Sequence, residues 1–471
     1  MNICRRNIAK TILPLLVFLL SCTALPEKTE KFFVRGAGQL TVYLNGPEKS
    51  VLGIAFVVEE IHVQDAKGNW LMVASEAIRV ESHSLVGKQL RLGEKTIPKG
   101  EYQGLKLVIG DASLVKERER VSLLVSEREV MVDFDFEVYG EENTTIFLDW
   151  DIDRSMPREH LFAPVFRAKI ETRELPSLKI YVTNEDSDNV SVINRSVGKV
   201  VSTVAVGKKP KGIAASPDGN FIFVANSGSD NISVINTSTN RVVHTINLDF
   251  GDQPVDLAID PSGRNLLVAN YRTNSILVID AFSFQIIRRI EVGRGPVAIG
   301  IDTRRNKAYI ANSLSNDVTV FGIFSQRVST AIKVESQPFD VAVDSRRRRV
   351  FIINRGSNNL TVIDSSNDRV IGRVTVGVNA AGVAVEPGRD RIFVSKERSN
   401  QVLFLRPSLN SITNSVMVAD SPNRLILDAE KRKLFVVNRR SNTLTVIDKV
   451  TARKEATIKV GSKPFEVVST E

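Results

Sequence analysis

The sequence predicts an all-β protein in which an N-terminal β-sandwich is followed by a seven-bladed β-propeller closed by the C-terminal strand. Three observations predict this fold. Short alternating apolar runs fill residues 36–174, a repeat of about 42 residues fills 177–471, and the last segment has strand character but no partner within its own repeat. The 471-residue chain is 42% hydrophobic and 25% charged, which is typical of globular proteins with ample cores.

Residues 1–21 have the pattern of an export signal rather than of a folded element. A basic start containing Arg5 and Arg6 precedes the apolar run "TILPLLVFLL", which is too short to span a membrane. The run ends in "LLSC" (residues 19–22), which resembles the bacterial lipobox. The resemblance implies cleavage before Cys22 and attachment of diacylglycerol to its sulfur. The alternative is an ordinary signal peptide with an incidental cysteine.

The cysteine content is consistent with lipidation. Cys4 and Cys22 are the only cysteines, so the mature chain would have neither a disulfide nor a free thiol. Residues 22–35 are polar and charged, and we expect them to be a tether from the lipid to the first domain. The expected location is therefore the cell envelope. The residue after Cys22 is Thr23 rather than Asp. In this respect the sequence resembles lipoproteins sorted to the outer membrane, if the organism has two membranes.

The segment 36–174 alternates as half-buried strands do. In "VMVDFDFEV" (residues 130–138), Val132, Phe134 and Phe136 fall on one face and the aspartates on the other. The segment also resembles a family of unknown function found near the start of bacterial lipoproteins, although Asn45 stands where that family usually has Asp. The resemblance implies a transthyretin-like sandwich and no activity. It rests on "GQLTVYLNGP" (38–47), "IPKGEYQGLKLVI" (97–109), "FLDWDIDRSM" (147–156) and "FAPVFRAKI" (162–170).

Seven copies of one four-residue motif define the repeat in 177–471. Each unit holds four strand-like runs separated by turn residues, which is the pattern of a propeller blade. The motifs are YVTN, FVAN, LVAN, YIAN, FIIN, FVSK and FVVN, and they end at Asn184, Asn226, Asn270, Asn312, Asn354, Lys396 and Asn438. Together with "NVSVI", "VAVGKKP" and "SPDG" (216–219), these motifs resemble the YVTN-type propeller repeat of bacterial lipoproteins and archaeal surface-layer proteins.

The two ends of the repeat region predict how the ring closes. The first unit lacks the strand that follows the loop proline in the other units, and the chain ends with that strand, residues 465–470. We therefore expect the C-terminal strand to complete the first blade, so that no edge strand is left open.

The loop "NEDSDN" (residues 184–189) raises the question of a calcium site, because oxygen ligands at alternate positions bind calcium. Its six counterparts keep Ser or Thr at the fourth position and Asp or Asn at the fifth, but they do not keep the negative charge. The repeated part therefore predicts a turn at positive φ, with the leading Asn closing an Asx-turn. A calcium ion peculiar to this one loop remains the alternative, and no metal site is assigned.

Function in a propeller usually depends on residues that differ between blades near the channel mouth. The loop proline marks this mouth, and the innermost strand begins two residues later. Four of the seven residues at that position are charged: Asp256, Asp340, Arg424 and Glu466. They are the candidate ligand-facing ring. The alternative is a hydrated channel without a specific ligand.

Basic residues cluster in "DTRRNK", "DSRRRRV", "EPGRDR" and "DAEKRK", in turns that should lie on the face opposite the proline loops. These turns, in a chain of net charge +9, could bind an envelope polyanion, and the alternative is a solvated basic rim. Aromatic residues are not interleaved with the basic ones, so no nucleic acid is expected.

Motifs for catalysis are absent from the sequence. Neither CxxCH nor G-x-S-x-G occurs, and three of the four histidines precede the repeat region, so no catalytic residue and no cofactor is assigned. The function predicted is a lipid-anchored binding or scaffold protein that meets a protein or polyanion partner. The alternative is a propeller hydrolase, lyase or lactonase with acids at the channel mouth, since some propellers have these activities.

Overall fold

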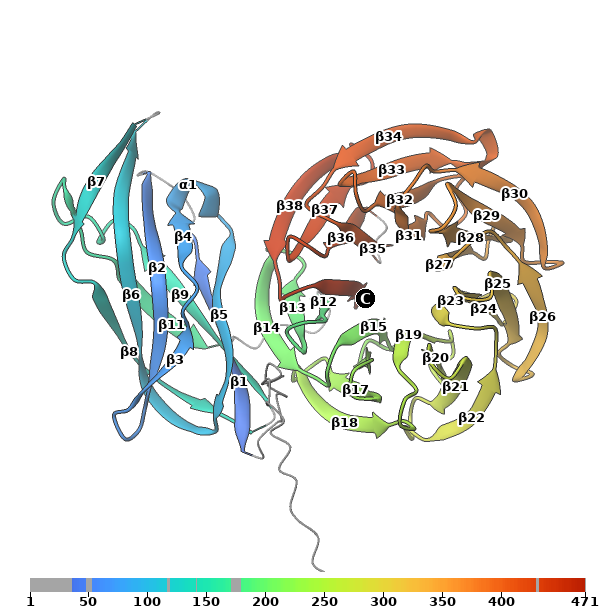
Figure 1. Cartoon of the computed structure of the whole chain (residues 1–471), viewed down its shortest axis with the longest axis horizontal. Helices are drawn as coiled ribbons and strands as arrows, with labels where there is room; N and C mark the ends of the chain where they lie inside the picture. The colour runs from blue at the N-terminus through green and yellow to red at the C-terminus, as the bar shows by residue number, and fades with distance from the viewer. Residues whose placement is uncertain are drawn as a thin grey trace, which may run out of the picture. The chain divides into compact units, whose positions relative to one another are not determined.

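A computed structural model describes residues 36–47, 53–116, 119–140, 142–170, 179–428 and 432–470. The predicted signal peptide, the lipidation site Cys22 and the tether lie outside these residues. No helix among the described residues has both the length and the apolar character needed to cross a membrane. The described elements are almost all strands, as the sequence predicts (Figure 1).

The N-terminal domain is a sandwich of two sheets. One sheet has the order β11 (Val165–Ile170), β9 (Asn143–Asp151), β1 (Ala37–Asn45), β5 (Gln89–Pro98). The other has the order β10 (Leu161–Phe162), β7 (Glu119–Val125), β6 (Gly100–Lys116), β2 (Ile54–Asp65), β3 (Trp70–Ala74), with β4 (Ile78–Glu81) paired to β2 and β8 (Glu129–Val138) paired to β6. The short helix α1 (Ser82–Leu85) follows β4.

An apolar core fills the space between the two sheets. Phe56 from one sheet has its ring centroid 5.0 Å from that of Trp150 in the other, in an edge-to-face arrangement. The predicted alternation in β8 is confirmed, because Val132 and Phe136 are buried while the aspartates between them are exposed. The predicted sandwich is therefore correct.

The repeat region forms seven four-stranded antiparallel sheets within the described residues, which we number as blades 1 to 7 (Figure 1). Blade 1 contains β39 (Pro464–Ser469), β12 (Lys179–Asn184), β13 (Asn189–Asn194) and β14 (Lys199–Ala205), from the innermost strand outward. Blade 2 contains β15 (Pro210–Ala215), β16 (Phe221–Asn226), β17 (Asn231–Asn236) and β18 (Arg241–Asn247). Blade 3 contains β19 (Pro254–Ile259), β20 (Asn265–Asn270), β21 (Ser275–Asp280) and β22 (Ile286–Glu291).

The remaining blades repeat this order. Blade 4 contains β23 (Pro296–Asp302), β24 (Lys307–Asn312), β25 (Asp317–Gly322) and β26 (Arg327–Lys333), and blade 5 contains β27 (Pro338–Asp344), β28 (Arg349–Asn354), β29 (Asn359–Asp364) and β30 (Arg369–Thr375). Blade 6 contains β31 (Ala380–Val385), β32 (Ile392–Lys396), β33 (Gln401–Arg406) and β34 (Ser411–Met417), with a short 3-10 helix (Pro407–Leu409) before β34. Blade 7 contains β35 (Pro422–Leu427), β36 (Lys433–Asn438), β37 (Thr443–Asp448) and β38 (Arg453–Lys459).

The ring closes as the sequence predicts. The C-terminal strand β39 pairs antiparallel with β12, opposing Val467 to Val182 and Ser469 to Ile180. Figure 1 shows this red C-terminal strand beside the green β12. Val467 is only 2% exposed, and it belongs to a core cluster shared with β36 and β37 of blade 7. The last strand thus links the first blade to the last.

The predicted hairpin corners adopt positive φ. The fifth corner residue has φ between 48° and 56° at Asp188, Asp230, Asn274, Asn316, Asn400 and Asn442. The leading Asn, however, does not have the role predicted for it. In blade 1, Asn184 donates from Nδ2 to Asn189 Oδ1 at 2.8 Å and to Ser191 Oγ at 2.9 Å, and so it clamps two strands. The same side-chain pairing recurs in blades 2, 4 and 5.

Six of the seven corners also hold the loop that enters the next blade. The Asp188 side chain accepts a 2.8 Å hydrogen bond from the backbone N–H of Lys209, the residue before the loop proline of blade 2. Lys209 has φ of 51°, an uncommon conformation for a residue other than glycine and especially for one before proline. Equivalent bonds, of 2.7 to 3.0 Å, join Asp230 to Gln253, Asn274 to Gly295, Asn316 to Gln337, Asn400 to Ser421 and Asn442 to Lys463.

Removing residues 464–471 should abolish most of the cooperative stability of the propeller, because blade 1 would lose its innermost strand and its shared core with blade 7. We expect the melting temperature to fall by about 10 °C or more, or the single transition to split, in thermal unfolding followed by circular dichroism. Lys454→Ala, on the exposed outer strand β38, is the control and should melt like the unmodified protein. A truncated protein that melts like the full chain would contradict this closure.

Candidate functional site

The four predicted site residues come together at the axis of the ring. Glu466, Asp256, Asp340 and Arg424 lie on the innermost strands of blades 1, 3, 5 and 7. Arg424 Nη1 forms a short ion pair with Asp340 and lies 4.0 Å from Glu466 Oε1. The side chains of Arg424 and Asp340 are both at least 93% buried. The sequence therefore identified residues that form one charged cluster, while ligand binding by them remains a prediction.

Arg424 reaches across the channel. Its Nη2 donates a 3.1 Å hydrogen bond to the backbone carbonyl of Val297 in blade 4, although Arg424 itself belongs to blade 7. Its Nε is buried and has no hydrogen-bond partner among the described residues. A buried donor without a partner is costly in free energy, so this atom marks a place where a ligand or water acceptor would be favourable.

The three carboxylates have a structural role that the sequence reasoning missed. Each accepts a hydrogen bond from a backbone N–H within the next blade's innermost strand: Asp256 from Ile299 at 2.7 Å, Asp340 from Val383 at 2.8 Å, and Glu466 from Ile213 at 3.3 Å. These acids therefore join neighbouring blades.

Small residues at the alternate positions make this packing possible. Gly212, Ala298 and Gly382 lie between the charged positions in the order of the blades. A Cβ added to Gly212 would lie 2.6 Å from the Cα of Asp256, and one added to Gly382 would lie 2.4 Å from the carbonyl oxygen of Asn423. The alternation of charged and small residues thus follows from the crowding at the axis.

Burial changes the protonation of the cluster. It raises the pKa of Asp256 from 3.8 to about 6, and it also raises the pKa values of Asp340 and Glu466, although the positive charge of Arg424 opposes the change in all three. Burial lowers the pKa of Arg424, but the charges of Asp340, Glu466 and Asp256 outweigh this effect and raise it above its ordinary value. The three acids around the Arg424 guanidinium therefore hold protons up to a higher pH than exposed carboxyl groups do.

A cavity of about 480 Å³, which we call the mouth cavity, opens where the proline loops meet, and Arg424 lines it. The other lining residues were not predicted. Five of them directly follow the loop proline, one residue earlier than the predicted ring: Lys211, Val255, Val297, Phe339 and Phe465. Others are Tyr271, Ser313, Arg355 and Arg439, which follow the last residue of the repeated motif. These residues differ between blades at equivalent positions of the repeat, and this variation is the sequence signal that could have identified them.

Basic groups and phenylalanine rings alternate around the mouth cavity. Lys211 Nζ lies 5.7 Å from the ring centroid of Phe465, and the Arg439 guanidinium lies 5.4 Å from the same centroid. The guanidinium of Arg355 lies 4.6 Å from the ring centroid of Phe339, and that of Arg424 lies 5.9 Å from it. These distances are typical of cation–π contacts.

Two of these cations are paired with acids from the adjacent blade. Arg439 forms a short ion pair with Glu185, and Arg355 forms one with Glu397. Asp186, the other acid particular to the first loop, lies 2.6 Å from Lys463 Nζ. The two acids of NEDSDN thus face basic groups. No group of three or more His, Cys, Asp or Glu side chains with the geometry of a metal site occurs in the described residues.

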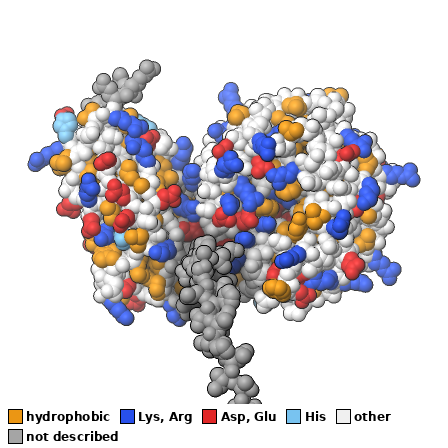
Figure 2. Space-filling view, in the orientation of Figure 1, with side chains coloured by type: hydrophobic (Ala, Val, Ile, Leu, Met, Phe, Trp, Pro, Cys, Tyr) orange, Lys and Arg blue, Asp and Glu red, His pale blue; other side chains and the backbone are white. Residues whose placement is uncertain are grey.

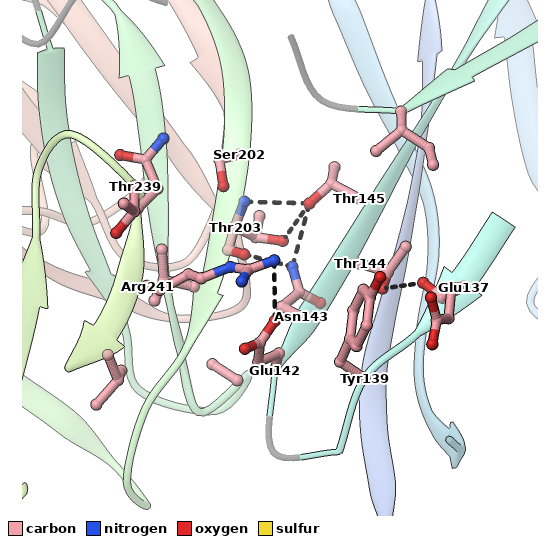
Figure 3. Close-up of a pocket in the computed structure, with 15 residues that line it drawn as sticks. Glu137, Tyr139, Glu142, Asn143, Thr144, Thr145, Ser202, Thr203, Thr239 and Arg241 are labelled. Atoms are coloured by element: carbon pink, nitrogen blue, oxygen red, sulfur yellow. Dashed lines mark hydrogen bonds and ion pairs between the residues drawn. The ribbon is translucent and has the colours of Figure 1, made fainter. Parts of the chain in front are cut away.

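A second cavity, of about 300 Å³, lies where β9 of the sandwich contacts β14 of blade 1 (Figure 3). Thr145 Oγ1 lies 2.9 Å from Thr203 Oγ1, and Asn143 Nδ2 donates to the carbonyl oxygen of Thr203 at 2.6 Å. Glu142 and Arg241 form an ion pair of 3.4 Å on another side. Because these polar groups pair with one another, we assign the cavity to the contact between the two domains rather than to ligand binding.

The basic turns predicted opposite the mouth are at the surface. Arg304, Arg346, Arg347, Arg348 and Arg389 are exposed in the turns of blades 4, 5 and 6. Several make ion pairs with neighbouring acids, among them Arg389 with Glu386 at 3.3 Å. Figure 2 shows basic side chains spread over the visible surface and interspersed with acidic ones. The residues of the blade 7 turn, 429–431, lie outside the described residues.

A β-sandwich followed by a ring of four-stranded blades, with a lined cavity at the axis, defines a β-propeller protein with an added N-terminal domain. The chain belongs to the YNCE-like beta-propeller family, whose model matches residues 174–470. Residues 37–161 match the model described as a domain of unknown function (DUF4382). No curated protein matches the sequence.

Solved structures agree with the fold. Hydrazine synthase of Kuenenia stuttgartiensis matches with a TM-score of 0.51 and 21% identity over 58% of this chain and 93% of that one. A functionally unknown protein of Desulfotomaculum acetoxidans DSM 771 matches with a TM-score of 0.55 and 15% identity over 63% of this chain and all of that one. At these identities the likeness shows the propeller fold alone.

Asp256→Asn should reduce the dependence of stability on pH. Folding raises the pKa of the carboxyl from 3.8 to about 6, so the folded state keeps a proton that the unfolded state releases. The contribution of Asp256 to stability is therefore present below about pH 4 and is lost as the pH rises to about 6. The amide cannot titrate but still offers an oxygen to the Ile299 N–H.

We expect the fall in the free energy of unfolding between about pH 4.5 and about pH 7.5 to be smaller in the variant by about 1–3 kcal/mol, measured by urea titration. Asp153→Asn, at an exposed position of the sandwich, is the matched control and should behave like the unmodified protein. The same pH dependence in Asp256→Asn and in the unmodified protein would mean that Asp256 is ionised throughout.

Proposed function

We propose that this chain is a lipid-anchored binding protein of the cell envelope, in which a YVTN-type propeller presents the mouth cavity to a ligand. The observation that carries the proposal is the make-up of the cavity. The loops around it occupy equivalent places in the blades, whereas the side chains that enter it differ in kind, as Lys211, Val255 and Phe339 at equivalent positions show. A purely structural repeat would need no such variety.

Anchoring rests on the N-terminal sequence. Residues 1–21 are the proposed signal peptide, and Cys22 is the proposed lipidation site, so that the membrane is a partner through the lipid. The tether of residues 22–35 would place the sandwich nearest to the membrane. The proposed location is the outer membrane or the periplasmic side in a bacterium with two membranes.

A second candidate function is a hydrolase, lyase or lactonase that uses the acids at the axis. It is favoured by the pKa of Asp256, which at about 6 suits a general acid or base near neutral pH. Against it, Asp256, Asp340 and Glu466 each already accept a backbone N–H from the next blade. We therefore prefer the binding function.

Replacing Cys22 with Ser should release the protein from membranes, because the hydroxyl cannot accept the diacylglyceryl group that the thiolate accepts. The measurement is the distribution of the protein between the membrane and soluble fractions after cell disruption, with Cys4→Ser as the matched control. If the Cys22→Ser protein stays with the membranes, lipid attachment at this residue is excluded.

The choice between mouth and basic face can be tested by thermal shift of the Cys22→Ser protein against sugars, metals and envelope polyanions at two salt concentrations. Stabilisation by a small molecule that Phe339→Ala abolishes would support the mouth cavity. A stabilising effect of polyanions that weakens at high salt and is lost on replacing Arg346, Arg347 and Arg348 with Ala would support the opposite face instead. A new activity lost in Asp256→Asn would support the enzyme.

A further inference from the structure

We propose that the mouth cavity binds a small organic anion, in which a carboxylate or phosphate group is attached to a flat apolar body. This inference rests on the proposed function, because it names the chemical class of ligand that the mouth cavity takes. Three features of the described residues support it: a half-buried cation without an acidic partner, a buried donor without a partner, and two phenylalanine rings bordered by cations.

The half-buried cation is Lys211. Among the described residues it has no carboxylate oxygen within 4.0 Å of its Nζ, unlike Arg355 and Arg439 beside it. Burial lowers the pKa of Lys211, and the negative charge of Glu185 offsets this only in part. An anion placed in the cavity would stabilise the charged amine, and Arg439 faces the same phenylalanine ring and could bind the same anion.

The unpartnered donor is Nε of Arg424, a residue that lines the cavity. The other two nitrogens of this guanidinium are engaged by Asp340 and by the Val297 carbonyl, which fix its plane. Of the three nitrogens, only Nε has no hydrogen-bond acceptor among the described residues. The guanidinium, held in a fixed plane beside the cavity, would add directional hydrogen bonding to the charge supplied by Lys211.

The apolar part of the cavity indicates that the ligand is more than a bare ion. Phe339, Phe465, Val255, Val297 and Leu314 all line it. Its volume of about 480 Å³ is in the range of small-molecule sites and is much larger than a phosphate needs. The two phenylalanine rings that line the cavity are apolar surfaces suited to a flat ligand. The anionic group and the flat body are therefore expected in one molecule.

The test is isothermal titration calorimetry on the full-length Cys22→Ser protein with four probes: 2-naphthoate, 2-naphthyl phosphate, the neutral 2-naphthol, and inorganic phosphate. We expect at least one of the two naphthyl anions to bind about tenfold or more tightly than 2-naphthol and inorganic phosphate. Comparison of the two anions distinguishes a carboxylate from a phosphate ligand. Lys211→Met and Arg439→Met should each weaken the binding of the tighter naphthyl anion by about fivefold or more, and added salt should weaken this binding further.

Lys454→Met is the matched control. It removes one positive charge from the exposed outer strand β38, away from the cavity, and should leave the affinity for the probes unchanged. Phe339→Leu keeps an apolar side chain at this position, so the variant should fold. It should bind every naphthyl probe more weakly than the unmodified protein does. Thermal unfolding of each variant checks its folding.

The outcomes separate the two proposals. If 2-naphthol binds as tightly as the anions and Lys211→Met has no effect, while Phe339→Leu weakens all naphthyl probes, the anionic class is wrong but the mouth remains a binding site. If the Phe339→Leu and Lys211→Met variants both bind the probes with the affinity of the unmodified protein, the probes bind elsewhere and both proposals fail. If none of the four probes binds at millimolar concentration, the inference is overturned.

Discussion

The propeller depends on one repeated hydrogen bond between blades. In it, a side-chain oxygen at the fifth corner position accepts the N–H of the residue before the next loop proline, as Asp188 does for Lys209. The residue before the innermost strand has positive φ in all seven blades, and that strand begins with the loop proline in six of them and with Ala380 in blade 6. This conformation is unfavourable for an ordinary side chain, so it persists because the corner holds it. Since six of the corners hold the residue before the next innermost strand, the same bond helps to position the residues that follow near the axis.

Two layers of side chains follow from this placement. The second residue after each proline faces the crowded axis, where Asp256, Asp340 and Glu466 bond the next blade and Arg424 crosses between blades. The first residue after each proline lies nearer the opening, where Lys211 and four apolar residues line the mouth cavity with Arg424. The acidic layer is therefore mainly structural, and the layer of cations and rings above it is free to differ between blades. Arg424 belongs to both.

Blade 1 is the junction of the whole chain. Its innermost strand comes from the C-terminus, and its outer strand β14 contacts the sandwich within one compact unit. Gln89 bonds both the N–H and the carbonyl of Val200, and Thr145 accepts the N–H of Thr203, so side chains of the sandwich satisfy backbone groups of this edge strand. Tyr43 and Phe147 of the sandwich pack in a shared core with Ile193 and Val200. An edge that could pair with another chain is thereby covered.

The sequence by itself determined the elements that repeat: the strands, the corners at positive φ, and closure by residues 465–470, because period and turn chemistry are local properties that seven copies make unmistakable. It also placed Asp256, Asp340, Arg424 and Glu466 together, since equivalent positions of a ring share its axis. Only the tertiary structure decided that these acids bond backbone groups, that Asn184 clamps two strands, and that Lys211, Phe339, Phe465 and Arg439 surround a cavity. Those outcomes depend on distances across blades. Side-chain reach and packing set these distances, and no spacing in one chain encodes them.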